Sequence, residues 1–229
     1  MDLQVIVDFD ATITLEDTTD QLLQRFADAA WTEIEADWAE GRIGSRACMT
    51  RQVDLLRATP AELDAFADGV AIDWHFKSFE RMCGRLGIPL MIVSDGLDRV
   101  IARVLAKAGM GHLPVAANQL AHDGADRWRL AAPNAAPDCV SATCKCAVAR
   151  QRGPRLTLLI GDGRSDYCLA ARADFVFAKS KLLRHCLRHG IPHTSFADFA
   201  EAAEHLNALL GLQAAAARTP RDAREVMHG

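Results

Sequence analysis

The sequence predicts an α/β protein, in which a doubly wound parallel sheet carries an all-helical insertion after its first strand. Two observations predict the sheet. Short apolar runs recur along the chain, and amphipathic stretches of helical length separate them, which is the alternation typical of doubly wound folds. A third observation predicts the insertion, because residues 15–81 show helical periodicity without a convincing strand.

The predicted strands are short, apolar and rich in β-branched residues, as buried parallel strands should be. They span residues 3–7, 89–93, 156–160 and 174–178. The amphipathic stretches at residues 97–108, 141–150 and 164–172 are predicted to be helices between them. A small hairpin is expected within residues 115–130, where Asp123-Gly124 supplies a turn signal.

The segment from residue 15 to residue 81 is predicted to be a helical lid inserted into the core. Thr59-Pro60-Ala61-Glu62 is a strong helix start within it, with a capping hydroxyl, a proline and a glutamate in the favoured positions. An ordinary crossover between strands is the alternative, but one helix would suffice for that. We therefore expect a core of residues 1–14 and 82–229. A frayed tail is expected over about residues 218–229, where the sequence lacks a clear apolar face.

The composition argues against several classes of function. The chain has 229 residues and a formal net charge of −4, which does not suit a protein built mainly to bind nucleic acid or an anionic membrane. No stretch approaches the ~20 continuous apolar residues of a membrane helix. The N-terminus enters strand-like sequence at once, without the features of a secretory signal. We expect a cytoplasmic protein, and the sequence predicts no particular oligomeric state.

The seven cysteines are predicted to be reduced thiols, because their number is odd and no signal peptide accompanies them. Cys139, Cys144 and Cys146 form the one cluster along the chain. A zinc site needs about four ligands with supporting spacing, and neither a CxxC pair nor a fourth ligand is evident nearby. A structural or redox-silent role is therefore favoured.

Acidic side chains follow the predicted strands at the edge where open α/β sheets bind their ligands. Asp8 and Asp10 follow the first strand, Ser94 follows the second, and Asp162 and Asp166 follow the third. One acid after a strand means little, since aspartate is common in turns and helix caps, but three such strands are harder to explain as caps. Two carboxylates two residues apart repel each other, so a positive or protonated group is expected between them, with a divalent metal as the leading candidate.

A site of this composition suits phosphoryl transfer. Acids alone would repel a doubly charged phosphate ester, but Mg²⁺ held by carboxylates can bridge protein and phosphate oxygens. Lys145 supplies a second positive charge, and Ser94 with the amides near Gly96 can donate to phosphate oxygens. Lys145 is preferred to Lys107, Lys179 and Lys181 because of its order in the chain and its place at the start of a predicted helix. Transfer through an aspartyl-phosphate would divide this slow hydrolysis into two displacements.

Four motifs occur in an order that resembles the haloacid dehalogenase (HAD) superfamily. They are Asp8-x-Asp10-x-Thr12, Ser94 after a strand, Lys145, and Gly161-Asp162-Gly163-x-x-Asp166. The helical insertion resembles the cap of the phosphoserine-phosphatase-like branch of that superfamily. A closer resemblance is to the methionine-salvage phosphatases that act on 2-hydroxy-3-keto-5-methylthiopentenyl-1-phosphate. It is carried by residues 8–14, Cys144-Lys145 and residues 173–178, and it extends over residues 182–199.

The resemblance implies a role for each matching residue. Asp8 would be the nucleophile, and Asp10 would protonate the leaving alkoxide and then deprotonate the attacking water. Asp10 must then start protonated, above its reference pKa of about 3.9, and the nearby Asp8 charge favours that state. Mg²⁺ would be held by Asp8, the backbone carbonyl of Asp10 and Asp162, with Asp166 in support. The residues of the phosphate site would be Thr12, which orders the loop, and Ser94, Asp95, Gly96 and Lys145.

Two departures from the family pattern concern the site. Phosphoserine phosphatases usually carry glutamate where this chain has Asp17, and that residue helps to receive the substrate's amino group, so the shorter acid weakens this substrate assignment. Ala11 stands where glycine or serine is usual, and its small side chain should leave the chemistry intact.

The lid is expected to set specificity, near Asp17 and Asp20. Further candidates there are Arg25, Trp31, Arg46 and Arg51, although the aromatic and apolar side chains of the lid more often form its own core.

The sequence therefore predicts a Mg²⁺-dependent hydrolase of a small phosphorylated metabolite, with phosphoserine phosphatase as the alternative substrate assignment. A phosphoacceptor module of the receiver type also uses strand-end acids, a lysine and Mg²⁺. Receivers, however, are about half this length and lack both the insertion and the second acid, Asp10. A degenerate HAD protein that only binds a phosphorylated ligand is a further alternative, but nothing essential to catalysis is missing from this chain.

Overall fold

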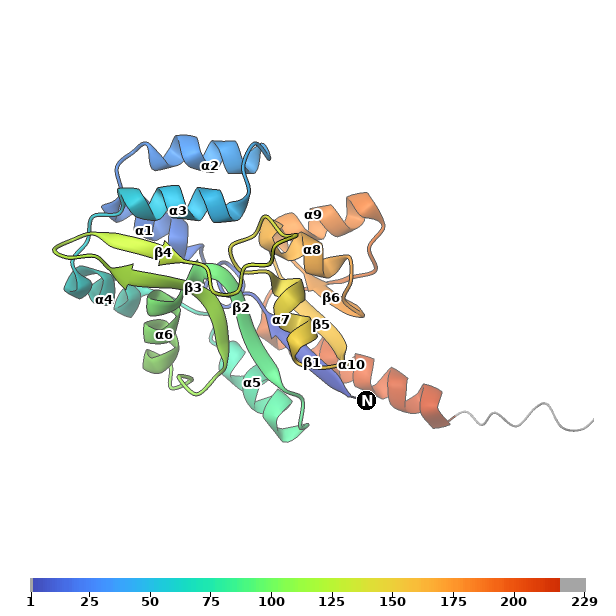
Figure 1. Cartoon of the computed structure of the whole chain (residues 1–229). Helices are drawn as coiled ribbons and strands as arrows, with labels where there is room; N and C mark the ends of the chain where they lie inside the picture. The colour runs from blue at the N-terminus through green and yellow to red at the C-terminus, as the bar shows by residue number, and fades with distance from the viewer. Residues whose placement is uncertain (1, 219–229) are drawn as a thin grey trace, which may run out of the picture.

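The computed structural model describes residues 2–218 and contains a seven-stranded, mostly parallel sheet (Figure 1). The strand order is β4-β3-β2-β1-β5-β6-β7. The strands are β1 (Leu3–Val7), β2 (Leu90–Leu97), β3 (Val115–His122), β4 (Trp128–Ala131), β5 (Leu156–Gly161), β6 (Phe175–Ala178) and β7 (Thr194–Ser195). The predicted α/β class is confirmed, and β3 with β4 forms the predicted antiparallel hairpin.

Strand β1 lies in the middle of the sheet because apolar residues face both sides of it. All five of its residues are buried. It pairs in parallel with β2, where Val7 lies opposite Ile92, and with β5, where Val7 lies opposite Ile160. This register brings the carboxyl ends of three strands to one level, so the residues that follow them meet at one edge of the sheet.

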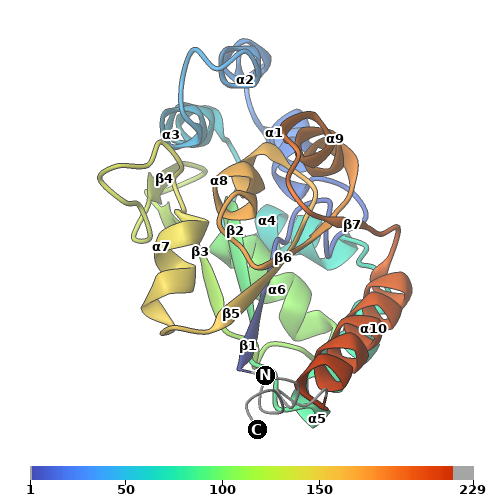
Figure 2. The same ribbon diagram turned by 90° about the vertical axis from the view of Figure 1, so that its right-hand side faces the viewer.

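Helices cover both faces of the sheet, and Figure 2 shows α7 and α10 on opposite sides of it. One face carries α5 (Phe76–Arg85), α6 (Asp98–Lys107) and α10 (Phe199–Arg218). The other carries α7 (Lys145–Gln151), α8 (Tyr167–Ala170) and α9 (Ser180–His189). Val5 and Val7 of β1 pack into the first core cluster and Ile6 packs into the second. A strand with apolar residues on both sides is what two helical layers require.

Four helices are inserted between β1 and β2. They are α1 (Thr18–Phe26), α2 (Trp31–Ala39), α3 (Ser45–Leu55) and α4 (Pro60–Gly69). Helices α2 and α3 pack on each other at the top of Figure 1, at the end of the molecule opposite the N-terminus. Helix α4 starts with the predicted capping box: the Thr59 hydroxyl accepts from the Glu62 amide (3.3 Å), and the Glu62 carboxylate accepts from the Thr59 amide (2.8 Å).

The boundary expected at residue 81 falls inside α5, and this helix belongs with the core. Phe76 and Phe79 are fully buried and pack against Phe199 of α10, with ring centroids 4.8 and 5.3 Å apart. Helical periodicity identified α5 correctly as a helix but could not show which surface it packs against. The inserted helices therefore end with α4, at Gly69.

Several element ends differ from the predictions. Strand β2 continues to Leu97 instead of ending at Val93, and its pairing with β3 shifts register between these two residues. The helix predicted over residues 164–172 is a 3₁₀ turn, Arg164–Asp166, followed by α8. The tail expected to fray lies, after Arg218, outside the described residues. No helix within residues 2–218 is long and apolar enough to span a membrane.

Candidate active site

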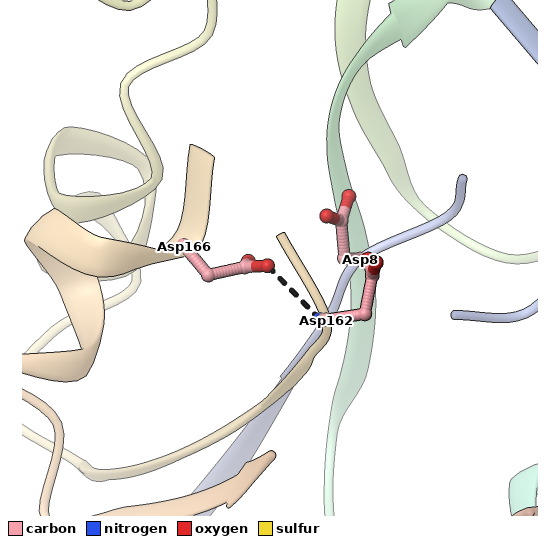
Figure 3. Close-up of side chains that lie close together, drawn as sticks. All are labelled: Asp8, Asp162 and Asp166. Atoms are coloured by element: carbon pink, nitrogen blue, oxygen red, sulfur yellow. Dashed lines mark hydrogen bonds between the residues drawn. The ribbon is translucent and has the colours of Figure 1, made fainter. Parts of the chain in front are cut away.

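Three aspartates meet at the carboxyl edge of the sheet, as Figure 3 shows. Asp8 follows β1, Asp162 follows β5, and Asp166 ends the 3₁₀ turn before α8. One carboxylate oxygen from each lies within 4.8 Å of the other two. Within residues 2–218, no other group of three or more His, Cys, Asp or Glu side chains has this spacing. The strand register thus brings together side chains that lie far apart in the sequence.

Lys145 is the cation within this carboxylate cluster. It is the first residue of α7, its side chain is 1% exposed, and its Nζ lies 2.7 Å from Asp8 Oδ2 and 2.6 Å from Asp166 Oδ1. Burial lowers the pKa of Lys145, but the charges of Asp166 and Asp8 outweigh burial and hold this pKa above its usual value. Lys145 therefore stays charged although it is buried.

The other lysines considered from the sequence lie outside the cluster. Lys107 is in the last turn of α6. Lys179 donates to the backbone carbonyl of Thr12 at 3.3 Å, and Lys181 lines the cavity beyond the cluster. Lys145 alone of the four contacts Asp8 and Asp166.

Asp166 orders the loop between β5 and α8. It is fully buried, and its Oδ2 accepts from the amides of Gly163 (3.0 Å) and Asp162 (3.2 Å). A Cβ on Gly161 would lie 2.5 Å from the Asp166 carboxylate, so only glycine fits there. Burial raises the pKa of Asp166, and the ion pair with Lys145 opposes this rise. Asp166 thus positions both the lysine and the turn that presents Asp162.

Asp10 lies against the start of α1 and against β2. Its Oδ1 accepts from the amide (3.0 Å) and the hydroxyl of Thr18, and its Oδ2 lies 3.5 Å from the Thr19 hydroxyl. A Cβ on Gly96 would lie 2.3 Å from Asp10 Oδ2, so this carboxyl group sits directly over the Gly96 backbone. Burial, with the charge of Asp17, raises the pKa of Asp10 well above its usual value. The fold therefore favours the protonated carboxyl that a general acid needs.

The loop from β1 to α1 is held in place through Thr12 and Ala11. The buried Thr12 hydroxyl donates to Asp162 Oδ1 at 3.1 Å, so it supports the loop and is not free for a ligand. Ala11 has a φ of +52°, in the left-handed region that favours glycine. Alanine keeps this loop at a small conformational cost, which accounts for the glycine that the family often has there.

The carboxylate cluster fits a hard divalent cation such as Mg²⁺. Carboxylate oxygens are ligands that Mg²⁺ prefers, and of the three grouped here only those of Asp8 and Asp166 form an ion pair with Lys145. Burial and the charge of Asp8 raise the pKa of Asp162 to about 6, as expected for a carboxylate short of positive partners. Thr18 occupies Asp10 Oδ1, and the resemblance implies that Asp10 contributes only its backbone carbonyl to the metal.

The residues expected to bind phosphate separate into two groups. Ser94 is buried, and its hydroxyl accepts from the Gly96 amide at 2.9 Å at the wall of the cavity. The Asp95 side chain differs, because its two oxygens accept from the Ser45 hydroxyl and from the Thr143 amide (2.6 Å). These contacts commit the Asp95 carboxylate to the protein, and they leave only its backbone for a phosphate.

A cavity of about 110 Å³ extends from the carboxylate cluster toward the inserted helices. Its lining from the inserted segment consists of Asp17, Thr19, Asp20, Glu35, Trp38, Ser45, Cys48, Met49 and Gln52. Asp17 also caps α1, where it accepts from the Asp20 amide at 3.0 Å. Burial and the charge of Asp20 raise the pKa of Asp17 to about 6. Both lid acids singled out from the sequence therefore reach the cavity.

The other four lid side chains proposed from the sequence do not line this cavity. Arg25 lines a separate hollow between α1 and α4, and Arg46 donates to backbone carbonyls of a core loop. Trp31 and Arg51 are also absent from the lining. Charge and size suggested them, but helix orientation decides which face reaches the cavity. The lining residues of the inserted segment that sequence reasoning missed are Thr19, Glu35, Trp38, Ser45, Cys48, Met49 and Gln52. Met49 and Gln52 are three residues apart on one helix face, and this spacing is the signal that could have found them.

Arg164 joins the core to α2 beside the cavity. Its Nη1 donates to the carbonyls of Trp38 (2.7 Å) and Ala39 (2.8 Å), and its guanidinium lies 5.6 Å from the Trp38 ring centroid. The last carbonyls of a helix attract a cation in this way. Because Arg164 follows directly after Gly163, the contact holds α2 next to the loop that presents Asp162.

The cysteine cluster has a neighbour that the sequence did not reveal. The Sγ of Cys168 in α8 lies 3.3 Å from the Sγ of Cys146 in α7. All seven cysteines are free thiols. Within residues 2–218, none of them belongs to a group of three or more possible ligands within 4.8 Å of one another.

Comparison with known proteins identifies the family of this site. The model of the haloacid dehalogenase-like hydrolase family matches residues 5–171. The chain is a haloacid dehalogenase-like hydrolase. The two central motifs of the site, around Asp8 and around Asp162, both fall within the matched residues.

Several relatives of this hydrolase are named as phosphatases. It is 28% identical over 204 residues to the 2-hydroxy-3-keto-5-methylthiopentenyl-1-phosphate phosphatase of Brevibacillus brevis, which covers 86% of this chain and 91% of that protein. The phosphatase of the same name from an Exiguobacterium species is 29% identical over 218 residues. That alignment covers 90% of this chain and 98% of the Exiguobacterium protein. A phosphoserine phosphatase solved as a phospho-aspartyl intermediate analogue superposes with a TM-score of 0.66 at 19% identity. The superposition covers 89% of this chain and 98% of that structure's chain. This last likeness shows the fold alone, and the family with its named relatives makes this hydrolase a phosphatase.

Proposed function

We propose that this phosphatase is a Mg²⁺-dependent phosphomonoester hydrolase that works through an aspartyl-phosphate on Asp8. The observation that carries the proposal is the different environment of two carboxyl groups at one cavity. Asp8 forms an ion pair with Lys145 at 2.7 Å, whereas burial raises the pKa of Asp10 well above its usual value. A carboxylate paired with a cation beside a carboxyl that favours its proton is the arrangement that separates a nucleophile from a general acid.

The first step would transfer the phosphoryl group to Asp8. An Asp8 oxygen attacks phosphorus, the bond from phosphorus to the leaving oxygen breaks, and Asp10 gives its proton to the departing alkoxide. Asp8 is held for this attack, because its Oδ1 accepts from the Phe9 amide at 2.8 Å and its Oδ2 pairs with Lys145.

The second step would hydrolyse the aspartyl-phosphate. Asp10, now a carboxylate, takes a proton from a water molecule whose oxygen attacks phosphorus, and inorganic phosphate leaves as Asp8 is restored. The amide and hydroxyl of Thr18 donate to Asp10 and stabilise its charged form between the two steps. Asp10 thereby alternates between its two protonation states without moving from its place.

The residues around the nucleophile would hold the metal and the phosphate. Asp8, the backbone carbonyl of Asp10 and Asp162 would hold Mg²⁺. When bound, Mg²⁺ neutralises phosphate charge and lets a dianion approach the acidic cluster. Ser94 and Lys145 would bind phosphate oxygens, and the Gly96 amide, which donates to Ser94 Oγ, would orient that hydroxyl. Thr12 and Asp166 would support these residues: Thr12 donates a hydrogen bond to Asp162, and Asp166 forms an ion pair with Lys145.

Helices α1–α4 would form the cap that selects the substrate. We propose that the substrate is 2-hydroxy-3-keto-5-methylthiopentenyl-1-phosphate, the compound in the names of two sequence relatives, whose alignments cover 86% and 90% of this chain. Trp38, Cys48 and Met49 line the cap side of the cavity. Aromatic and sulfur-containing side chains make favourable contacts with a thioether, so this surface suits a methylthio group.

A small phosphate ester that carries an ammonium group, such as phosphoserine, is the second candidate. Asp17, Asp20 and Glu35 line the same side of the cavity. Burial raises the pKa of Asp17 to about 6, which is expected of a carboxyl group without a cationic partner. An ammonium group on the substrate would supply such a partner.

Phosphate release from the two substrates, measured with Mg²⁺ and with EDTA, tests the proposal. The methylthio substrate should have the higher kcat/KM, and EDTA should stop both reactions. Met49→Gln should lower kcat/KM for the methylthio substrate by about tenfold, the scale of a lost apolar contact, and affect phosphoserine less. Glu35→Gln is the matched control on the same wall and should show the reverse preference. Phosphate release by Asp8→Asn at the wild-type rate would contradict the proposed mechanism.

A further inference from the structure

Asp95 links three segments of the molecule although it directly follows Ser94 at the proposed phosphate site. It lies in β2, its Oδ2 accepts from the hydroxyl of Ser45 in α3, and its Oδ1 accepts from the Thr143 amide at 2.6 Å. We propose that Asp95 is a positioning residue, which joins the cap to the loop that presents Lys145. This inference rests on the proposed function, because it assigns Asp95 a part in the same reaction.

The first contact of Asp95 fixes the loop before Lys145. Thr143 lies two residues before Lys145, and it is completely buried, as is Asn118 of β3. The Asn118 side chain donates to the Asp95 carbonyl at 2.6 Å and accepts from the Thr143 hydroxyl at 3.1 Å. Asp95, Asn118 and Thr143 thus form a closed set of hydrogen bonds. Because the Lys145 side chain must reach Asp8 and Asp166 from this loop, the position of Thr143 sets the position of the catalytic cluster's cation.

The second contact of Asp95 fixes the start of α3. Ser45 is the first residue of α3, and its hydroxyl also accepts from the Ala142 amide at 3.3 Å. The next residue, Arg46, donates from its backbone to Val140 O at 3.1 Å and from its side chain to Cys139 O at 2.7 Å. The start of α3 is therefore bound to the same loop that leads to Lys145.

The Asp95 carboxylate lies at the centre of this junction. On one side the carboxylate accepts from the Thr143 amide, and this bond fixes the loop that carries Lys145. On the other side it holds α3, which lines the leaving-group part of the cavity with Met49 and Gln52. Asp95 therefore ties the placement of the cation at the nucleophile to the placement of the wall that meets the leaving group.

The two sides of the junction make separable contributions to the reaction. Asp95→Ala should lower kcat/KM by at least about tenfold, since each hydrogen bond to a charged group is worth about that factor or more. Ser45→Ala frees only the α3 side, so its effect should fall mainly on KM. Asn118→Ala frees only the loop side, so its effect should fall mainly on kcat. Asp95→Asn should restore most of the activity, because an amide can accept from Thr143 and donate to Ser45.

A matched control is available at Asp98, near the end of the same strand. Like the Asp95 carboxylate, the Asp98 carboxylate accepts from a backbone amide, here that of Leu120 in β3 at 2.9 Å, but Asp98 does not line the cavity. Asp98→Ala should lower the free energy of unfolding and leave the ratio of kcat to KM unchanged. A merely structural role for Asp95 would give it the same behaviour as Asp98.

The experiment combines steady-state kinetics on the full-length protein with hydrogen exchange of the Thr143 amide. Faster exchange at Thr143 in Asp95→Ala, with rescue by Asp95→Asn, is the expected result. The inference is overturned if Asp95→Asn is as impaired as Asp95→Ala, or if Ser45→Ala and Asn118→Ala change KM and kcat alike. If Asp95→Ala does not fold, the split between KM and kcat in Ser45→Ala and Asn118→Ala still tests the inference. A wild-type protein that hydrolyses no phosphomonoester would contradict the proposed function instead, and the exchange measurement would still test the junction.

Discussion

Replacing Lys145 by methionine removes the buried cation that pairs with Asp8 and Asp166, while it keeps a side chain of similar length. The Lys145 side chain is 1% exposed, and its partners are 6% and 0% exposed. At this degree of burial, water can solvate the two carboxylates only in small part. The variant therefore leaves two buried carboxylates without their cation.

The magnitude follows from the two distances. Ion pairs of 2.7 and 2.6 Å are each worth about 6 kcal/mol before desolvation, at an effective dielectric constant of about 20. Lys145 itself is expensive to bury, so the net loss for breaking such a buried group is about 3–5 kcal/mol. Burial already raises the pKa of Asp166, so this carboxyl can take up a proton once the lysine is absent. The loss should therefore be smallest at low pH and should grow as the pH rises.

Urea unfolding in EDTA at pH 5.5 and pH 8 is the assay, with Lys107→Met as the control for loss of an exposed lysine. Lys145→Met should lower the free energy of unfolding by about 3–5 kcal/mol at pH 8 and by less at pH 5.5. Addition of Mg²⁺ should recover part of the loss, because the metal supplies opposite charge at the same carboxylates. A variant as stable as wild type in EDTA at pH 8 would refute the reasoning.

Three further substitutions test other parts of the account. Gly96→Ala places a Cβ 2.3 Å from Asp10 Oδ2, so kcat should fall strongly while the circular dichroism spectrum is unchanged; wild-type kcat would show that Asp10 is not needed where it lies. Ala11→Gly relieves a φ of +52° and should raise the free energy of unfolding by about 0.5–1 kcal/mol, whereas a destabilised variant would rule out strain there. For Asp17, burial and the charge of Asp20 raise the pKa to about 6, so its stabilising contribution is complete below pH ~4 and is lost as the pH rises through about 6. Asp17→Asn, an equally good helix cap, should therefore raise the thermal midpoint at pH 8 but not at pH 4, and equal effects at both values would count against this linkage.

The sheet and its catalytic edge could be predicted because the signals are local. The run that forms β1 is apolar on both faces, and Asp8 and Asp10 follow it at once. The same form recurs at β5 and Asp162. The carboxyl ends of parallel strands lie at one edge of the sheet. The convergence of these acids can therefore be predicted from the strands alone, without the rest of the chain.

The ends of elements and the placement of α5 could not be predicted because they depend on distant partners. Strand β2 continues past Val93 because it pairs again with β3 at Leu97 and Asn118. Helix α5 joins the core because Phe76 meets Phe199, more than a hundred residues later in the chain. Helical periodicity shows that a face is buried but does not show what buries it.

The cap side of the site was predicted least well, for a related reason. Arg46 is a candidate specificity residue from the sequence, yet its side chain donates to Cys139 O in the loop before Lys145. The resemblance places Asp95 in the phosphate site, but its carboxylate is bound by Ser45 and Thr143. Both outcomes depend on contacts between the cap and the core, and local sequence does not encode those contacts.

Trapping of the phosphoryl group during turnover tests the central assignment most directly. Acid quench of the enzyme with its substrate, followed by borohydride reduction, converts an aspartyl-phosphate to homoserine, which mass spectrometry of peptides can locate. The account predicts modification at position 8. Phosphate release by wild type with an unmodified Asp8, or with the label on another residue, would contradict it.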